Sequence, residues 1–500
     1  MKQDSLFRTP YVLLLLISTL ALQACVTIQT SPVSGNKRVY GYSWDQEVNI
    51  GRDSDSEIIA QYGLYDDEEL AKYVDNLGQE LLEVSHMRRE SAEQKYKDTQ
   101  FTFRVLSSPV VNAFALPGGY VYVTRGLLSH LNNEAQLAVV LGHEIAHVAA
   151  RHASQRAAEQ QVGQILIMGG AIGGQLAGLD GGQIAQLSSQ TAQLMFLQYG
   201  RDDERESDAL GVEYSAMKNY EAAEGAAFFT SLKRIQEKAG VSIPSHLSSH
   251  PDPGEREQTI PRLAAEWEQE GYTQNKVGEE QFMRMIDGIM YGDNPREGFE
   301  EDGIFYHPDL AFQFPVPDGF SLVNQPSAVI MFNSEQNAIT QFSIDGQQAS
   351  AQASVQSFLG QEGITTISQT ALSVNGLDGY QGVATTPAQD GSTIQLLVSS
   401  VTFKGKVYSF LSYTSAAQYP TYENEFKGIV SGFEQLFDQE KLDVQPVRLK
   451  LVKTTKTAPF SLQLPDKLPM GLTKEELAIV NQVQMDELIE AGRTLKIPVQ

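Results

Sequence analysis

The chain is poor in cysteine, in positive charge and in long apolar runs, and each shortage excludes something. Cys25 is the only cysteine among 500 residues, so no internal disulfide can form. Lys and Arg number 37 against 62 Asp and Glu, and the net charge of −25 argues against nucleic-acid binding and wide contact with anionic lipid. Between residues 162 and 200 no apolar run reaches the roughly 18 residues that cross a bilayer.

The N-terminal segment has the pattern of a targeting signal. Lys2 and Arg8 precede an apolar run over residues 11–22, which ends in Leu-Gln-Ala and Cys25. This pattern resembles a bacterial lipoprotein signal peptide, with Cys25 as the lipidated residue and Val26, rather than an Asp, favouring the outer membrane. An uncleaved membrane anchor and ordinary secretion are the alternatives. Residues 30–40, rich in Ser, Pro and Gly, are expected to form a tether.

Two histidines and a glutamate carry the first sign of chemistry. His143 and His147 are four residues apart, so on a helix both imidazoles face one metal ion, while Glu144 reaches a metal-bound water. Zinc lowers the pKa of such a water, and the carboxylate takes the proton. A metzincin is excluded, because Ala150 and Ala153 stand where its Gly and third His would be.

A zinc site of this kind needs a third protein ligand, and Glu204 offers one. If residues 204–208 are helical, Asp208 lies one turn further on the same face and can accept a hydrogen bond from a ligand histidine, His143. The alternative is a solvated helix face of mixed charge. His152 lies nine residues after His143, about 180° around a helix, so we expect it to pack or hydrogen-bond at the helix end.

The periodicity predicts how these residues are held. Asn133 with Gln136 is a helix cap, and the helix that follows is expected to run through His143 to about Arg156. Gly142 inside it predicts a close backbone approach. The turn at residues 112–119 suits an edge strand to which an extended substrate adds, or else an ordinary hairpin. Further helices and strands are predicted at 44–62, 66–84, 100–107 and 120–124.

Four segments together resemble one protein family. Asn112-Ala113-Phe114, Gly118-Gly119, HEIAHVAARH from His143 and ERESD from Glu204 are similar to peptidase family M48, the gluzincin zinc metalloproteases of the BepA-like, Oma-like and HtpX-like kind, over roughly residues 31–303. The resemblance implies one Zn²⁺ per chain, held by His143, His147 and Glu204, with Glu144 as general base. Ser207 stands where the family usually has Ala.

The same resemblance implies a role for His250 near the metal. The family has a Ser-His-Pro segment there, and His250, with Arg256 following, matches it. His250 would either stabilise the tetrahedral oxyanion as a catalytic residue or occupy the open zinc position in a latent state. The glycine-rich residues 162–200 between the two motifs form either a lid or a close helix packing.

The predicted fold class is α+β, with four parts. A signal peptide (1–25) precedes a mainly helical zincin-like peptidase domain with a small sheet (26–302). Residues 303–440 alternate as short strands with two helices, typical of an α+β sandwich that positions a substrate or partner, or is a passive spacer. The tail, 441–500, resembles a degenerate LysM module, which implies cell-wall glycan binding, although its first half lacks the usual Gly-Asp-Thr.

The sequence therefore predicts a zinc metalloendopeptidase that is lipid-anchored, faces the periplasm and sits at the outer membrane. Family resemblance points to unfolded or misassembled envelope proteins as substrates. One alternative is a chaperone or assembly factor for outer-membrane proteins, whose latent site is capped by His250. Another is a wall-anchoring module in which proteolysis is incidental.

Overall fold

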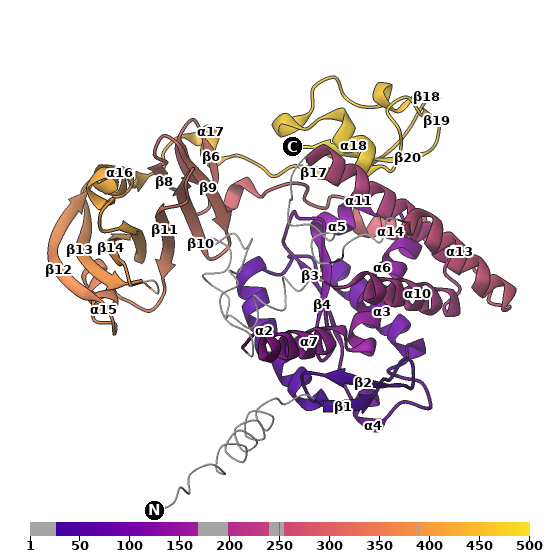
Figure 1. Ribbon diagram of the computed structural model, residues 1–500. Coiled ribbons are helices and arrows are strands. Elements are labelled where there is room, and N and C mark those ends of the chain that lie inside the picture. Colours follow the sequence, from indigo (N-terminus) through magenta and orange to yellow (C-terminus); the bar gives the residue numbers. More distant parts are fainter. Residues whose placement is uncertain (1–26, 169–198, 240–249, 251–254, 389–390) are drawn as a thin grey trace, which may run out of the picture. The chain divides into compact units, whose positions relative to one another are not determined.

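The computed structural model describes residues 27–168, 199–239, 250, 255–388 and 391–500 (Figure 1). Cys25 lies outside these residues, as do most of the glycine-rich segment 162–200 and the neighbours of His250 at 240–249 and 251–254. No helix in the described part is long and apolar enough to cross a membrane.

The described residues form two compact units. The first takes its residues from Met1–Ile59, Leu64–Tyr291 and Leu449–Val499, and the second is essentially Gly292–Arg448. Both contain helices and sheets, so the mixed α and β class is confirmed. The predicted four-part division and the LysM-like nature of the tail stay predictions.

The first unit is mainly helical around a small sheet. Its order is β1 (Thr27–Thr30), β2 (Lys37–Tyr40), α2 (Trp44–Tyr62), α3 (Glu68–Val84), α4 (Gln94–Lys97), β3 (Thr102–Leu106), β4 (Ala113–Leu116), β5 (Tyr120–Thr124), α5 (Arg125–His130), α6 (Glu134–Ala150), α7 (His152–Met168), α10 (Arg201–Met217), η1 (Ala222–Glu224), α11 (Gly225–Ala239), α13 (Arg256–Gln269) and α14 (Glu279–Ile286). The elements predicted at 44–62, 66–84, 100–107 and 120–124 are confirmed to within two residues at each end.

The small sheet has the strand order β3-β5-β4, with β3 parallel to β5 and β4 antiparallel to it. Strand β4 is therefore an edge strand. It also packs against α6, the helix with the two histidines. Helix α3 covers β3, and its apolar stripe explains why it does: Leu70, Val74, Leu77 and Leu81 recur at helical spacing and are all buried.

The tether predicted at residues 30–40 is wrong, because part of that segment is a β-hairpin. Strands β1 and β2 pair antiparallel, from Thr27 opposite Tyr40 to Thr30 opposite Lys37. Two arginines hold the hairpin on the first unit. Arg151 donates to the Gln29 side chain at 2.7 Å, and Arg38 pairs with Glu206 at 2.8 Å.

Helix α6 begins as predicted and ends earlier than predicted. Asn133 caps it by accepting a hydrogen bond from the Gln136 N–H at 2.9 Å. The helix does not continue to Arg156, because Arg151 adopts a left-handed conformation (φ 63°) and α7 starts afresh. That conformation costs about 1–2 kcal/mol in an L-residue. It is offset by the buried Arg151 guanidinium, which donates to Glu47 at 2.8 Å and stacks on the Tyr40 ring.

The close approach predicted at Gly142 is confirmed. Helices α6 and α10 pack against each other (Figure 1). Gly142 faces Gly211 across the contact. A Cβ on Gly142 would lie 2.9 Å from the Gly211 carbonyl oxygen, and one on Gly211 would lie 2.8 Å from the His143 nitrogen. Both obstacles are backbone atoms, so they cannot be moved aside cheaply.

The tail of the chain also packs on the first unit. It contains β17 (Arg448–Lys453), β18 (Ala458–Pro459), η3 (Phe460–Leu462), η4 (Pro469–Gly471), α18 (Lys474–Val480), β19 (Leu488–Ile489) and β20 (Thr494–Val499). Lys496 is fully buried, and its ammonium donates to the carbonyls of Ser129 and Leu131 at 2.8 and 2.9 Å. Burial lowers the pKa of Lys496 well below its usual value, and the carbonyls at the negative end of α5 oppose that shift by favouring the charged form.

The second unit is built on a seven-stranded antiparallel sheet of order β12-β13-β14-β15-β11-β10-β9, beside a four-stranded one of order β16-β8-β7-β6. Its elements are η2 (Pro295–Glu297), β6 (Phe299–Glu301), β7 (Ile304–His307), β8 (Phe312–Pro315), β9 (Phe320–Gln325), β10 (Ala328–Asn333), β11 (Ala338–Asp345), α15 (Ala351–Leu359), β12 (Thr365–Val374), β13 (Leu377–Pro387), β14 (Thr393–Phe403), β15 (Lys406–Ser415), α16 (Tyr419–Ser431), β16 (Glu434–Gln435) and α17 (Gln439–Leu442). A phenylalanine-rich core fills it.

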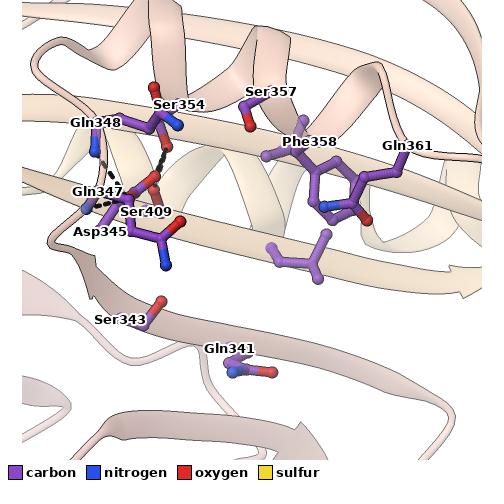
Figure 2. Close-up of a pocket in the computed structure, with 12 residues that line it drawn as sticks. Gln341, Ser343, Asp345, Gln347, Gln348, Ser354, Ser357, Phe358, Gln361 and Ser409 are labelled. Atoms are coloured by element: carbon purple, nitrogen blue, oxygen red, sulfur yellow. Dashed lines mark hydrogen bonds between the residues drawn. The ribbon is translucent and has the colours of Figure 1, made fainter.

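In this unit the sequence predicted β8, β10, β11, β14 and β15 and missed the other strands, among them β9, β12 and β13. A cavity lies beside helix α15. The cavity, of about 290 Å³, lies between α15 and the sheet and is lined mainly by amide and hydroxyl side chains (Figure 2). Asp345 accepts hydrogen bonds from the Ser354 hydroxyl and from the backbone of Gln347 and Gln348. These bonds tie the end of β11 to the start of α15.

We predict that Gly142→Ala destabilises the first unit by about 1–3 kcal/mol, because the added methyl group forces α6 away from α10. Urea unfolding of the first unit measures the change. Gly428→Ala on α16 is the matched control, since a Cβ there meets nothing within 4 Å. That control should leave stability unchanged or raise it by about 0.5–1 kcal/mol. Equal effects of the two substitutions would contradict the prediction.

Candidate metal centre

The structure brings the predicted metal ligands together inside the first unit. His143 and His147 come from α6, Glu204 comes from the first turn of α10, and His250 precedes α13 in the sequence. All four side chains are buried, and each offers one ligand atom within 4.8 Å of the others. Because α6 and α10 touch at Gly142 and Gly211, the two helices deliver these groups to one point.

The distances fit a tetrahedral zinc site. The two Nε2 atoms of His143 and His147 are 3.0 Å apart, and each lies 3.5 Å from an oxygen of Glu204. Zinc bonds of about 2.0–2.1 Å in tetrahedral geometry separate ligand atoms by about 3.3–3.4 Å. Two imidazoles and a carboxylate are also a donor set that zinc accepts. The residues present therefore fit the metal that the sequence predicts.

His250 lies at the fourth position of this cluster. Its Nδ1 is 3.3 Å from His143 Nε2 and 3.2 Å from a Glu204 oxygen. Its other ring nitrogen is 3.7 Å from the Glu144 carboxylate. His250 is thus within reach of both the metal ligands and the predicted general base.

Glu144 is fully buried beside the cluster. Burial raises the pKa of its carboxyl to about 8; the nearby Glu204 adds to the rise, while His143 and Arg256 oppose it. A carboxyl with a pKa near neutrality is suited to accept a proton and give it back.

The outer nitrogen of His143 faces Asp208, as predicted from the one-turn spacing. His143 Nδ1 lies 2.9 Å from an Asp208 oxygen, and both side chains are buried. Burial alone would raise the pKa of Asp208, but the charge of Arg256 and the contact with His143 outweigh it and lower the pKa. An ionised Asp208 accepts the Nδ1 hydrogen and leaves Nε2 of His143 for a metal.

Arg256 is a residue to which the sequence gave no role. It is the first residue of α13, and its buried guanidinium donates to Asp208 at 2.8 Å and to Glu204. Its charge thereby offsets the repulsion between these two carboxylates. Only its position shortly after His250 hinted at it, because a single arginine has no pattern of its own.

The site combines two buried histidines four residues apart on one helix, a glutamate from a second helix and an adjacent buried glutamate. This combination defines the class of HExxH metallopeptidases. Residues 75–264 match the sequence model of peptidase family M48, and this domain belongs to that family. The roles of the individual site residues stay predictions.

Several named relatives share this domain. The chain is 31% identical over 197 residues to a putative beta-barrel assembly-enhancing protease of Vibrio cholerae, with 37% of each chain covered. It is 27% identical over 231 residues to the mitochondrial metalloendopeptidase OMA1 of Schizosaccharomyces pombe, covering 46% of this chain and 64% of the relative. The chain thus spans less than two thirds of the relatives it matches.

A solved structure also gives a partial match. Cyanobacterial PsbP from Synechocystis covers 26% of this chain and 91% of its own, at 17% identity and a TM-score of 0.23. That score is too low to carry an argument about fold or function.

We predict that zinc raises the unfolding temperature of the EDTA-treated protein, with one ion bound per chain. An ion that binds only the folded state adds about 4 kcal/mol to the free energy of unfolding when its free concentration is 1,000 times its Kd. Thermal unfolding with and without zinc measures the shift. Glu204→Ala should lose most of it, whereas Glu213→Ala on the same helix should keep it. No shift in the unsubstituted protein would contradict the site.

Proposed function

We propose that this protein is a zinc metalloendopeptidase. The observation that carries the proposal is the buried cluster of His143, His147 and Glu204 beside the buried carboxyl of Glu144. Zinc, when bound, acidifies a water and polarises a peptide carbonyl. The Glu144 carboxylate, buried beside the cluster, would take the proton of that water and return it to the leaving amine.

The surrounding side chains keep this machinery in place. Asp208 holds the ring of His143, and Arg256 holds the carboxylates of Asp208 and Glu204. Among the described residues, strand β4 pairs with β5 alone, and it packs on α6. We propose that an extended peptide adds to its open edge by main-chain hydrogen bonds, which requires no particular side-chain sequence.

The proposed substrates are unfolded or misassembled proteins of the bacterial envelope. Two observations support this choice. Related chains of similar sequence are named beta-barrel assembly-enhancing proteases. The N-terminal 25 residues have the pattern of a lipoprotein signal. We therefore propose an outer-membrane lipoprotein that faces the periplasm and is anchored through Cys25.

A second candidate is a chaperone or assembly factor whose peptidase site is latent. The position of His250 favours it, because Nδ1 of His250 is as close to the ligand atoms as they are to one another. A fourth protein ligand closes the position that water and substrate need. In this alternative His250 must leave before cleavage begins.

We predict that Glu144→Gln binds one zinc per chain and loses casein cleavage by at least about 100-fold, because the amide cannot take the proton from water. The protein without residues 1–25 is the material, and zinc content and casein degradation are measured on it and on the variant. Equal cleavage by both would contradict the general base. Zinc bound without cleavage by either would favour the latent alternative.

The latent alternative predicts that His250→Ala raises casein cleavage severalfold, because the substitution opens the fourth position of the cluster. Glu144→Gln combined with His250→Ala is the control and should remain inactive. If His250→Ala instead abolished cleavage, His250 would take part in catalysis as an oxyanion donor, and the latent state would be rejected.

A further inference from the structure

The outer nitrogen of the second ligand histidine also has a partner, and that partner is His152. Because Arg151 is left-handed, the chain turns at the end of α6 and brings His152 back over His147. Their Nδ1 atoms are 3.0 Å apart, and their rings meet edge to face with centroids 4.9 Å apart. On an unbroken helix His152 would project away from the cluster. The left-handed residue thus creates this contact.

The other nitrogen of His152 continues the chain of contacts. Its Nε2 lies 3.0 Å from an oxygen of Glu206, which follows Glu204 by two residues on α10. The carboxylate of Glu206 also accepts a hydrogen bond from each Nη atom of Arg38, both at 2.8 Å. Arg38 belongs to β2 of the N-terminal hairpin. Four residues from four elements, β2, α6, α7 and α10, are therefore linked in one line.

The hydrogen-bonding capacity of these groups sets the direction of each bond. A carboxylate only accepts and a guanidinium only donates, so Arg38 donates to Glu206. Glu206 therefore also accepts from His152, which places the hydrogen of that ring on Nε2. With that hydrogen on Nε2, a neutral imidazole accepts at Nδ1. Two groups lie near this atom, the Ser207 hydroxyl at 3.4 Å and Nδ1 of His147 at 3.0 Å, and the nearer donor is the Nδ1–H of His147.

The result for His147 is a fixed tautomer. With its hydrogen on Nδ1, the lone pair of Nε2 faces the Nε2 of His143 and the Glu204 carboxylate. The opposite arrangement would place the hydrogen on Nε2 and bar this ring from a metal. We propose that His152, Glu206 and Arg38 are positioning residues for His147, an inference that rests on the proposed zinc site.

This arrangement gives each ligand histidine its own carboxylate on α10. Asp208 serves His143 directly, and Glu206 serves His147 through His152. Such outer partners orient a ligand ring and increase its basicity, and losing one typically costs about 10–100-fold in metal affinity. The hairpin that carries Arg38 thereby becomes part of the metal centre.

The test compares two replacements of His152 that differ in one property. His152→Phe keeps a ring against His147 but cannot accept a hydrogen bond. His152→Asn places an amide oxygen near the former Nδ1 and can accept it. We expect about a 10–100-fold loss of zinc affinity for the Phe variant and a smaller loss for the Asn variant. Affinity is measured on the EDTA-treated protein by competition with a chromogenic chelator.

Arg38→Ala tests the far end of the chain, with a matched control. It should weaken zinc binding severalfold, because Glu206 loses a partner and holds His152 less firmly. Arg89→Ala removes a comparably buried ion pair to Glu213, which lies nine residues and about 13 Å along α10 from Glu204. That control should leave zinc affinity unchanged. The visible absorption spectrum of the cobalt-substituted protein should shift in His152→Phe and not in Arg89→Ala.

Each outcome decides between the inference and a merely structural role. The inference is supported if His152→Phe binds zinc more weakly, His152→Asn recovers part of the zinc affinity and Arg89→Ala keeps all of it. Unchanged zinc affinity in His152→Phe overturns it while the proposed function stands. The inference is also overturned if His152→Phe and His152→Asn lose the same zinc affinity and this loss follows the fall in their unfolding temperatures. Absence of zinc in the unsubstituted protein overturns the inference and the proposed function together.

Discussion

The contact between α6 and α10 is the constraint on which the rest of the first unit depends. Gly142 and Gly211 have no side chain, so the two backbones approach until a Cβ on either would meet the other's main chain. Glu204 and Asp208, on the N-terminal half of α10, then reach the two imidazoles of α6. The ligands sit on helices, so their spacing follows from backbone packing and does not require a loop to be ordered.

Charge balance explains why so many ionisable groups can be buried at this point. Glu144, Glu204 and Asp208 are buried, and Arg256 is the cation among them. Carboxylates that are ionised in a dry site are costly unless a positive charge accompanies them. A divalent ion bound there would add positive charge beside Glu204 and Asp208, which is consistent with the proposed metal site.

Local patterns in the sequence predicted the parts of this site that local rules govern. The spacing of His143 and His147, the cap at Asn133 and the close approach at Gly142 each follow from helix geometry. Arg256 and the contact of His152 with His147 did not. Arg256 comes from α13, far along the chain from α6, and the His152 contact depends on a left-handed residue that no single sequence reveals. In the second unit, the edge strand β12 was missed since nearly all of it is exposed and shows no alternation.

The first unit combines segments that lie far apart in the sequence. A prediction made along the chain assigns these segments to separate domains. The second unit is inserted between Tyr291 and Leu449. Leu449 and Val480 from the tail nevertheless belong to the same hydrophobic core as the residues of α3 and α6. Lys496 satisfies two carbonyls at the end of α5, just before the helix that carries the histidines. Burying that ammonium is acceptable only while both carbonyls accept from it. The tail is thus tied to the peptidase unit by polar as well as apolar contacts, and the β1–β2 hairpin is tied to it in the same way through Arg38 and Arg151.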